Sequence, residues 1–429
     1  MTLTAGWRRL HPLSPILRSG KILLGISVGL APQAASEGPT VTLVLLGVSV
    51  PVLLVGGYLS WRRTRFTVEG SELHVMSGVL LHRERRVPLT RVQAIDVVRP
   101  LVGRALGLAE LRIEVVGGGD SEAPLAYLRE AEAAALRLEL LALARGERGA
   151  EPGAAEATER PPSRVLVSVP TKALVTSTLL DGHALTPLAL VVLLIAGAAV
   201  LPTEVIGGLG ATALAFGVAA FEVLRRRLLT EWAFSVTETP DGLVLAHGLV
   251  ETRSQTVPEG RVQGVRVVAP LLWRRRGWVR VEVDVAGYSG RQAELQTSTL
   301  LPVAPRELAE ALVARILGAE PPTTALEPPP RRARWLAPLS RQVLGLGFND
   351  RFAITRTGWL RTSTAIVPLG KAQGLRLRQG PLQRRLRLAT LHVDTAGRDI
   401  HAVALHRDAR EAAALLEELA DLARAARSA

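Results

Sequence analysis

One pattern occurs three times in this chain, and a repeat of this length limits the fold to three copies of one unit. The copies run from Gly78 to Gly117, from Gly248 to Gly287 and from Gly358 to Gly397, and they align over 40 residues without a gap. Each copy begins and ends with glycine and has a Val-Pro pair, a glutamine and an arginine at the same places. Several identities in register rarely arise by chance, so we expect a triplicated domain.

The shared polar positions form a signature that we interpret as structural. Its members are Pro88, Arg91 and Gln93; Pro258, Arg261 and Gln263; and Pro368, Lys371 and Gln373. A proline interrupts a ladder of strand hydrogen bonds, so it marks a strand end or a bulge. The repeated arginines Arg104, Arg274 and Arg384 suit a ligand site or the carbonyl groups at the rim of a barrel, and we favour the structural role.

Within each copy, apolar residues alternate as they do in half-buried strands. Leu111, Ile113 and Val115 show this period of two, and so do their counterparts in the other copies. An apolar helical pattern follows each copy, over residues 128–144, 305–317 and 408–426, with Asp408 as an expected N-cap. Several antiparallel strands followed by one helix predict a small β-barrel or sandwich that is closed by its C-terminal helix.

Long uncharged segments predict membrane-spanning helices. Three are clear, namely Val41 to Leu59, Ala184 to Leu201 and Val205 to Ala220, and Ile22 to Ala35 is a weaker fourth. We expect two transmembrane helical hairpins, although residues 22–35 also fit a signal peptide. Lys and Arg flank only one side of these segments, so both termini and all repeats are expected in the cytoplasm, at the inner membrane.

Composition excludes several kinds of chemistry. The chain has no cysteine, which removes disulfide scaffolds, thiol catalysis and Cys-based metal sites. No metal-binding or nucleotide-binding motif appears, and a metal at His392 and Asp394 is disfavoured against an ordinary polar pair. We therefore expect no enzyme activity, no metal and no cofactor. The formal charge of +13 suits an anionic membrane, whereas 4% aromatic residues leave few platforms for stacking nucleic-acid bases.

The repeats resemble those of a known family. The Val-Pro-x-x-Arg-Val-Gln segment, the segment Leu106 to Leu111 and the opening from Arg9 to Pro15 are similar to the bacterial pleckstrin-homology (PH) membrane proteins, the YdbS/YdbT-like family. The resemblance extends from Arg9 to about Ala426 and is weakest in the third repeat. It implies a PH-like β-barrel for each repeat and an inner-membrane location, and it supplies no catalytic activity.

The expected fold is therefore a membrane protein of the α + β class, with two transmembrane hairpins and three cytoplasmic PH-like barrels. The expected segments are an N-terminal segment with the first hairpin (1–61), the first domain (62–146), a linker (147–183), the second hairpin (184–225), the second domain (226–319), a Pro-rich linker (320–347) and the third domain (348–429). In the third domain, Phe352 stands close to Gly358, which predicts a shortened first strand hairpin.

Arginine clusters are the candidate contact surface. With neighbouring tryptophans they comprise Arg83, Arg85, Arg86, Arg104, Trp273, Arg274, Arg275, Arg276, Trp278, Arg384, Arg385 and Arg387. Clusters near a membrane attract anionic lipid, although plain solvated charge remains an alternative. The favoured function is a non-enzymatic scaffold or sensor that contacts lipid, protein partners or further copies of itself. The alternative is a component of a transport, export or envelope-stress resistance system.

Overall fold

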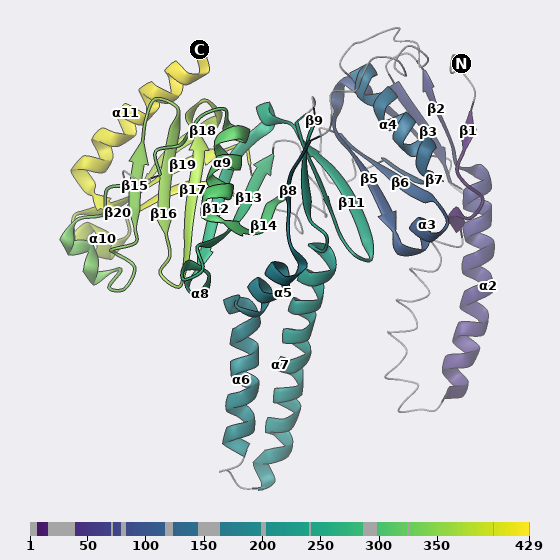
Figure 1. The fold of residues 1–429 in the computed structure, drawn as a ribbon, viewed down its shortest axis with the longest axis horizontal. Helices are drawn as coiled ribbons and strands as arrows, with labels where there is room; N and C mark the ends of the chain where they lie inside the picture. The colour runs from purple at the N-terminus through teal and green to yellow at the C-terminus, as the bar shows by residue number, and fades with distance from the viewer. Residues whose placement is uncertain are drawn as a thin grey trace. The chain divides into compact units, whose positions relative to one another are not determined.

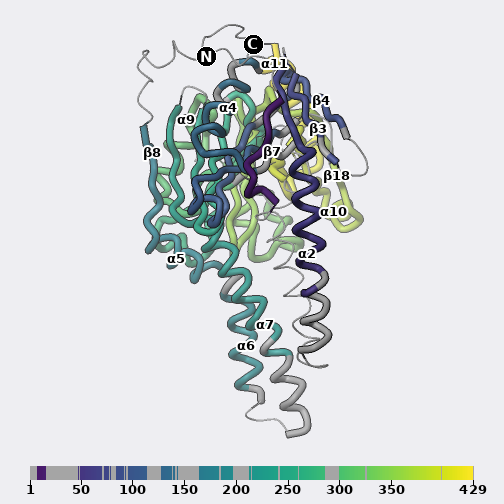
Figure 2. Tube along the Cα trace, turned by 90° about the vertical axis from the view of Figure 1, so that its right-hand side faces the viewer, coloured from purple at the N-terminus to yellow at the C-terminus, as the bar shows by residue number. Residues whose placement is uncertain are grey.

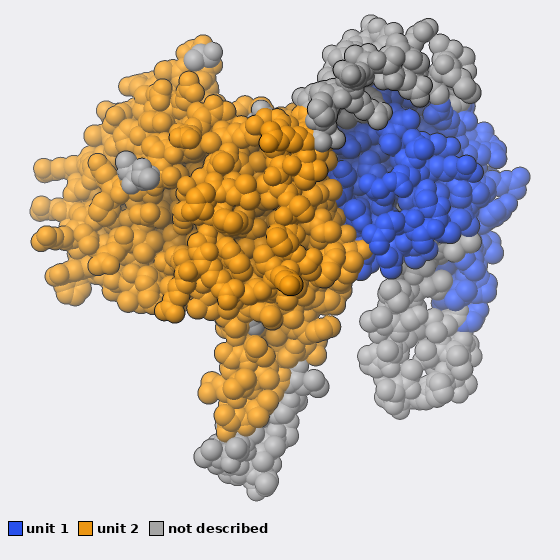
Figure 3. Space-filling view, in the orientation of Figure 1, with its two compact units in different colours: residues 1–162, 250–255, 287–291 blue, residues 163–249, 256–286, 292–429 orange. Residues whose placement is uncertain are grey.

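The computed structural model describes residues 7–15, 39–69, 72–78, 83–115, 123–144, 164–198, 203–239, 242–285, 298–323, 326–397 and 399–428. The chain divides into two compact units (Figure 3). The first comprises residues 1–162, 250–255 and 287–291, and the second comprises residues 163–249, 256–286 and 292–429.

The first unit contains the first repeat, folded as antiparallel sheets (Figure 1). Its first sheet has, in order, β1 (Arg8–Arg9), β2 (Arg65–Glu69), β3 (Glu72–Ser77) and β4 (Arg83–Pro88). Its second group of strands is β7 (Ala123–Arg129), β6 (Leu108–Val115), β5 (Val92–Pro100) and the start of β11 (Glu251–Val257). The helices are α2 (Pro39–Arg63), α3 (Leu101–Ala105) and α4 (Glu130–Ala144).

The second unit contains the second and third repeats. The strands of the second repeat, with one that precedes it, are β8 (Arg164–Ser168), β9 (Ser235–Thr239), β10 (Gly242–His247), β12 (Val262–Pro270), β13 (Trp278–Val285) and β14 (Ser298–Pro305). Those of the third are β15 (Gly345–Phe348), β16 (Phe352–Thr357), β17 (Arg361–Pro368), β18 (Ala372–Arg378), β19 (Leu388–Thr395) and β20 (Ala402–Asp408).

The helices of the second unit fall into two groups by position. Helices α6 (Gly182–Ala198) and α7 (Thr203–Thr230) pack side by side and extend away from the sheets, as both views of the chain show (Figures 1 and 2). The helices that belong to the sheets are α5 (Thr171–Leu179), α8 (Leu271–Arg274), α9 (Arg306–Leu317), α10 (Pro381–Arg385) and α11 (Ala409–Ser428).

The expected C-terminal helices lie where their patterns place them. Helices α4, α9 and α11 each begin directly after the last strand of a repeat. The Asp408 carboxylate accepts hydrogen bonds from the backbone N–H groups of Arg410 and Glu411, at 2.9 and 3.3 Å, which confirms it as an N-cap. Helix α9 ends at Gly318, whose φ of 70° lies in the left-handed region that favours glycine.

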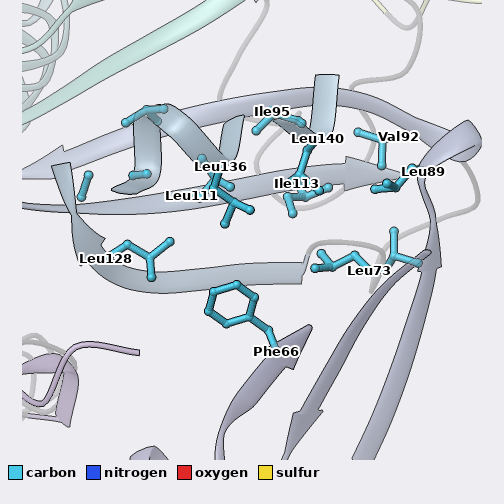
Figure 4. Packing of buried hydrophobic residues seen from close by; sticks show 14 of the residues in the cluster. Phe66, Leu73, Leu89, Val92, Ile95, Leu111, Ile113, Leu128, Leu136 and Leu140 are labelled. Atoms are coloured by element: carbon cyan, nitrogen blue, oxygen red, sulfur yellow. The ribbon is translucent and has the colours of Figure 1, made fainter. Parts of the chain in front are cut away.

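Alternating strand residues and one helix face build the core of the first repeat. Phe66 and Leu73 from the first sheet meet Leu111 and Ile113 from the second, and Leu140 of α4 covers them (Figure 4). All five side chains are buried. Burying each such side chain contributes about 1.5–3 kcal/mol, so this cluster is a main source of the domain's stability.

The prediction of two transmembrane hairpins is wrong. Among the described residues, no helix is both long and apolar enough to cross a membrane. Helix α6 has only 17 residues and is therefore about 26 Å long, which is less than the roughly 30 Å of a bilayer's hydrocarbon core. Pro51 lies inside α2, and Glu222 lies within α7. The weaker fourth candidate, residues 22–35, lies outside the described part of the chain.

The prediction of a separate barrel for each repeat is also wrong, because strands of different repeats share sheets. In the second unit one six-stranded sheet has the order β14-β13-β12-β17-β16-β15, so it combines strands of the second and third repeats. Strand β15 begins at Gly345, inside the expected Pro-rich linker, and pairs with β16. The first hairpin of the third repeat is therefore nearly as long as the others, because Phe352 opens its second strand and not its first.

Candidate functional site

The signature residues lie at a bend between two strands in every repeat. Pro88 and Pro368 are the last residues of β4 and β17, and Pro258 directly follows β11. A short 3₁₀ turn follows each proline, over residues 89–91, 259–261 and 369–371. The proline thus ends a strand in each repeat, as its missing N–H group requires.

The shared glutamine stands at a β-bulge. The strand register shifts between Val262 and Gly264, and it shifts at the same place in the other repeats, between residues 92 and 94 and between 372 and 374. Gln263 is buried, and its Nε2 donates to the carbonyl of Arg261 at 3.3 Å, whereas Gln373 is exposed. A repeated bulge favours a structural role. The side chains of Arg91 and Gln93 lie outside the described part.

The repeated arginine binds the start of the next repeat. Arg104 donates to the Thr252 hydroxyl at 3.2 Å, at the start of β11. Arg274 occupies the same position in the second repeat and donates to the carbonyls of Trp359 and Leu360, just before β17. The structure therefore assigns these two side chains to joints between repeats. Arg384, their counterpart in the third repeat, is exposed, and its guanidinium has no polar partner among the described residues.

Lys371, the third signature base, also makes a contact between repeats. Its Nζ donates to the carbonyl of Gly260 at 2.9 Å, in the 3₁₀ turn of the second repeat. This bond lies beside the pairing of β12 with β17 and adds a polar contact to that joint.

Trp273 is interior, so its expected place on the contact surface is wrong. It is fully buried, and its Nε1 donates to the carbonyl of Ser177 on α5 at 3.0 Å. The Arg227 guanidinium of α7 lies over its ring, 5.2 Å from the centroid. Trp273 thus connects α8 with α5 and α7, where a favourable cation–π contact holds it.

Arg227 belongs to a chain of half-buried charges that the sequence reading missed. It pairs with Asp181 and, at 3.2 Å, with Glu231. Glu231 also accepts from Arg280 of β13 at 2.6 Å, and Arg280 contacts Glu282 at 3.1 Å. Opposite charges alternate along this chain, so helix α7 is held to the sheet of the second repeat by ion pairs that are largely shielded from water.

Beside Trp273, apolar and basic side chains reach the surface together. Leu271, Leu272, Arg275 and Arg276 are exposed on α8 and the turn after it. The Arg276 guanidinium stacks on the half-buried Trp278, 5.1 Å from the ring centroid. In the expected cluster of residues 273–278, Arg275, Arg276 and Trp278 are therefore accessible. Arg274 is not available, because it hydrogen-bonds to the turn before β17.

The turn between β16 and β17 extends this surface. Trp359 is 41% exposed and Leu360 is 61% exposed. The backbone N–H of Leu271 donates to the Leu360 carbonyl at 2.7 Å, which holds the turn against α8. We call the exposed residues Leu271, Leu272, Arg275, Arg276, Trp359 and Leu360 the apolar–basic rim. In Figure 1 α8 lies at the end of the second unit from which α6 and α7 extend.

The two other arginine clusters differ in exposure and in ion pairing. Around α10, Arg384, Arg385 and Arg387 are all exposed. On β4, Arg86 is exposed and pairs with Glu84 at 2.9 Å, while Arg85 is half-buried. The side chain of Arg83 lies outside the described part. The α10 cluster is therefore the stronger of the two sources of uncompensated positive charge.

Asp394 pairs with Arg376, whose charge also acts on His392. Asp394 accepts from Arg376, with one contact at 2.8 Å, and this hydrogen bond holds the pKa of Asp394 below its usual value. Burial, followed by the charge of Arg376, lowers the pKa of His392. Among the residues that the structure describes, no cluster of three His, Asp or Glu side chains is suited to a metal ion.

Comparison with known proteins identifies the repeats. The family model described as "Bacterial PH domain" matches residues 22–144, 185–320 and 333–423, which is most of the chain. The chain belongs to the bacterial PH-domain family. This confirms the resemblance seen in the sequence, and each match contains one copy of the repeat.

A relative of these PH domains is the UPF0699 transmembrane protein YdbT of Bacillus subtilis (strain 168). It is 24% identical over 279 residues, which cover 60% of this chain. The match spans 57% of the relative's own length. No solved structure matches the chain.

Two features of the PH domains were not found from the sequence. The Arg227–Asp181 pair joins residues 46 positions apart, so no local pattern marks it. The Trp359–Leu360 pair had a visible signal, because two large apolar residues follow a turn glycine, Gly358, whose φ is 82°. Apolar residues at a turn seldom face the core, and this departure from the usual composition of turns points to an exposed contact.

Proposed function

We propose that the protein is a non-enzymatic scaffold that presents three PH-like domains at the cytoplasmic face of the cell membrane and contacts anionic lipid through the apolar–basic rim. Membership of the bacterial PH family and a relative named as a transmembrane protein support a role at the membrane. The observation that carries the proposal is the exposure of Trp359 and Leu360 beside Arg275 and Arg276.

The composition of the rim suits the boundary between lipid headgroups and acyl chains. Each arginine close to an anionic leaflet gains about 1 kcal/mol. A tryptophan settles at the headgroup level because its ring is apolar and its N–H is polar. Such contributions orient a domain on a membrane, and salt weakens their electrostatic part.

The test is quenching of tryptophan fluorescence by lipids with brominated chains. The full chain is mixed with vesicles of neutral lipid alone or with 30% anionic lipid. We expect the quenched signal to increase with anionic lipid, to decrease on going from low to high salt, and to be largely lost in the Trp359→Phe variant. Arg275→Gln with Arg276→Gln should reduce the dependence on anionic lipid by at least half, because two of the attracted charges are removed.

Trp335 provides the matched control. It is more exposed than Trp359, at 71%, but lies on a 3₁₀ helix outside the rim. Trp335→Phe should leave the lipid-dependent quenching unchanged. The rim is not the membrane contact if Trp359→Phe has no effect, or if Trp335→Phe removes as much of the signal.

A further inference from the structure

Consecutive PH domains in this chain are joined by one kind of strand pairing. Strand β5 of the first domain pairs with β11, and β12 of the second domain pairs with β17, both antiparallel. The register is the same in both joints. Val97 lies opposite Ser254 in the first, and Val267 lies opposite Thr364, at the equivalent repeat positions, in the second. The fourth strand position of a domain is thus an edge that accepts the strand of a neighbour.

The third domain presents the same edge without a neighbour. Its equivalent strand, β18, ends the sheet β18-β19-β20, and no strand pairs with its outer edge in the described part of the chain. Leu377 is 41% exposed, whereas Val97, at the same repeat position, is 8% exposed. The Arg384 guanidinium also has no partner among the described residues. Its counterpart Arg104 binds Thr252 at the start of the added strand, and Arg274 binds the turn before the added strand.

Strand β4 of a second copy fits this edge poorly. Among the described strands β4 pairs only with β3, so its other edge is open. In the register of the existing joints, Arg85 and Arg83 would lie opposite Arg376 and Arg378. Like charges directly opposite each other destabilise a strand pair. Neither existing joint contains such a pair, because Arg266 faces Ala365 and Arg253 faces Val98.

The charge of the edge indicates a different occupant. Arg378, Arg384, Arg385 and Arg387 are exposed on β18, on α10 and in the turn after it. An added strand forms backbone hydrogen bonds with any sequence, and its side chains decide which sequence is accepted. Acidic side chains opposite Arg376 and Arg378 would replace repulsion by attraction.

We propose that β18 binds an acidic, extended segment of a partner protein as an added antiparallel strand, in the register of the two joints within the chain. The carbonyl groups just before that segment would accept hydrogen bonds from Arg384, as those of Trp359 and Leu360 accept from Arg274. This site is separate from the apolar–basic rim and does not depend on lipid binding.

The probe is a ten-residue peptide with the sequence of residues 359–368 and three changes, Arg361→Glu, Ser363→Glu and Ala365→Glu. In the expected register two of these acids lie opposite Arg378 and Arg376. The control peptide carries Lys at the same three positions. Binding of the labelled peptides to the full chain in uncharged detergent is measured by fluorescence anisotropy. We expect the acidic peptide to bind at least tenfold more tightly than the lysine peptide.

Protein variants locate the site. Arg378→Glu should weaken binding of the acidic peptide at least tenfold, and Arg384→Ala should weaken it severalfold. Arg351→Glu makes the same charge change at an exposed loop position outside β18 and should alter binding less than twofold. Equal effects of Arg378→Glu and Arg351→Glu would show that the peptide senses only net charge, and the proposal would fail.

Backbone methylation separates strand addition from attraction of charges. Along an added antiparallel strand only alternate residues bond to the edge. N-methylation of one alternate set of peptide residues should therefore abolish binding, and methylation of the other set should preserve it. Equal binding of both methylated peptides, especially if anionic vesicles displace them, would assign the arginines to lipid. No saturable binding at all would mean that the arginines only protect the edge.

The same samples report whether a second copy is the occupant. Mass photometry of the full chain should show no dimers that the acidic peptide dissociates. Dimers that the peptide displaces and that Arg378→Glu prevents would identify the occupant as a second copy and overturn the proposal.

Discussion

Asp96 shows how one buried group depends on the joint between repeats. It lies on β5, and burial raises the pKa of Asp96 to about 6, although the charges of Arg137, Arg253 and Arg112 act in the opposite direction. Arg253 reaches it from β11, a strand of the second repeat. The carboxylate is thus tolerated because a neighbouring repeat supplies part of the positive charge around it.

The raised pKa predicts a specific pH dependence of stability. The folded state binds the proton of Asp96 more tightly than the unfolded state, so this group's contribution falls as the pH rises from about 4 through 6. Asp96→Asn removes the effect. The free energy of unfolding of the natural protein, relative to the variant, should fall by about 2 kcal/mol between pH 4.5 and 7. Thermal unfolding across this range measures the difference.

Asp350→Asn is the control for this prediction, because Asp350 is an exposed loop residue. It makes the same substitution at an exposed site and should change the unfolding temperature only slightly. A constant difference between the natural protein and Asp96→Asn across the range would show that Asp96 ionises with an ordinary pKa.

At the scale of elements, the second unit depends on how α7 is attached to the sheet. Helix propensity alone rarely stabilises a helix in a protein, and packing supplies most of the energy. Here the attachment uses Trp273 and the ion pairs of Arg227 with Asp181 and Glu231. The side chains of Arg227 and Asp181 are only 13% and 10% exposed, so loss of one partner leaves a shielded charge without compensation.

Arg227→Ala should therefore destabilise the second unit by about 3–5 kcal/mol, the usual cost of breaking a buried pair. Arg226→Ala, one residue away, removes an exposed arginine that pairs with Glu222 and should cost far less, because water screens an exposed pair. Urea unfolding followed by tryptophan fluorescence compares the two variants. Similar losses for both variants would show that the Arg227 pairs add nothing beyond surface charge.

At the scale of the whole molecule, the repeats are units of sequence but not independent units of folding. The sheet β14-β13-β12-β17-β16-β15 contains strands of the second and third domains, and the first unit includes residues 250–255 of the second repeat. A strand pair that crosses a repeat boundary couples the stabilities of its two sides, as neighbouring repeats do in repeat proteins. We therefore expect the second and third domains to unfold together.

Leu391→Ala tests this coupling. Leu391 is buried in the core of the third domain, and its truncation should cost about 2–5 kcal/mol. Hydrogen exchange should then accelerate in β17 to β20 and also in β12 and β13, across the boundary. Exchange in β2 and β3 of the first unit should stay unchanged. Acceleration limited to the third domain would mean that the shared sheet does not couple the two domains.

Sequence alone determined the local features of this protein. Period-two alternation, the repeated proline and glycine, and Asp408 depend on neighbours along the chain, so the strands, the turns and the N-cap of α11 were predictable, and three similar segments revealed the PH family. Tertiary structure decided the rest. Burial of Trp273, the use of Arg274 in a joint and the chain of charges at Arg227 depend on residues brought together from distant positions. The hydropathy of the sequence also led to the wrong prediction of membrane-spanning helices. It counts apolar residues but does not define where a helix begins and ends. Edge pairing between repeats has no sequence signal of its own, since backbone groups make its hydrogen bonds. Only the folded chain shows that, among the described strands, none pairs with the outer edge of β18 as β11 pairs with β5 and β17 with β12.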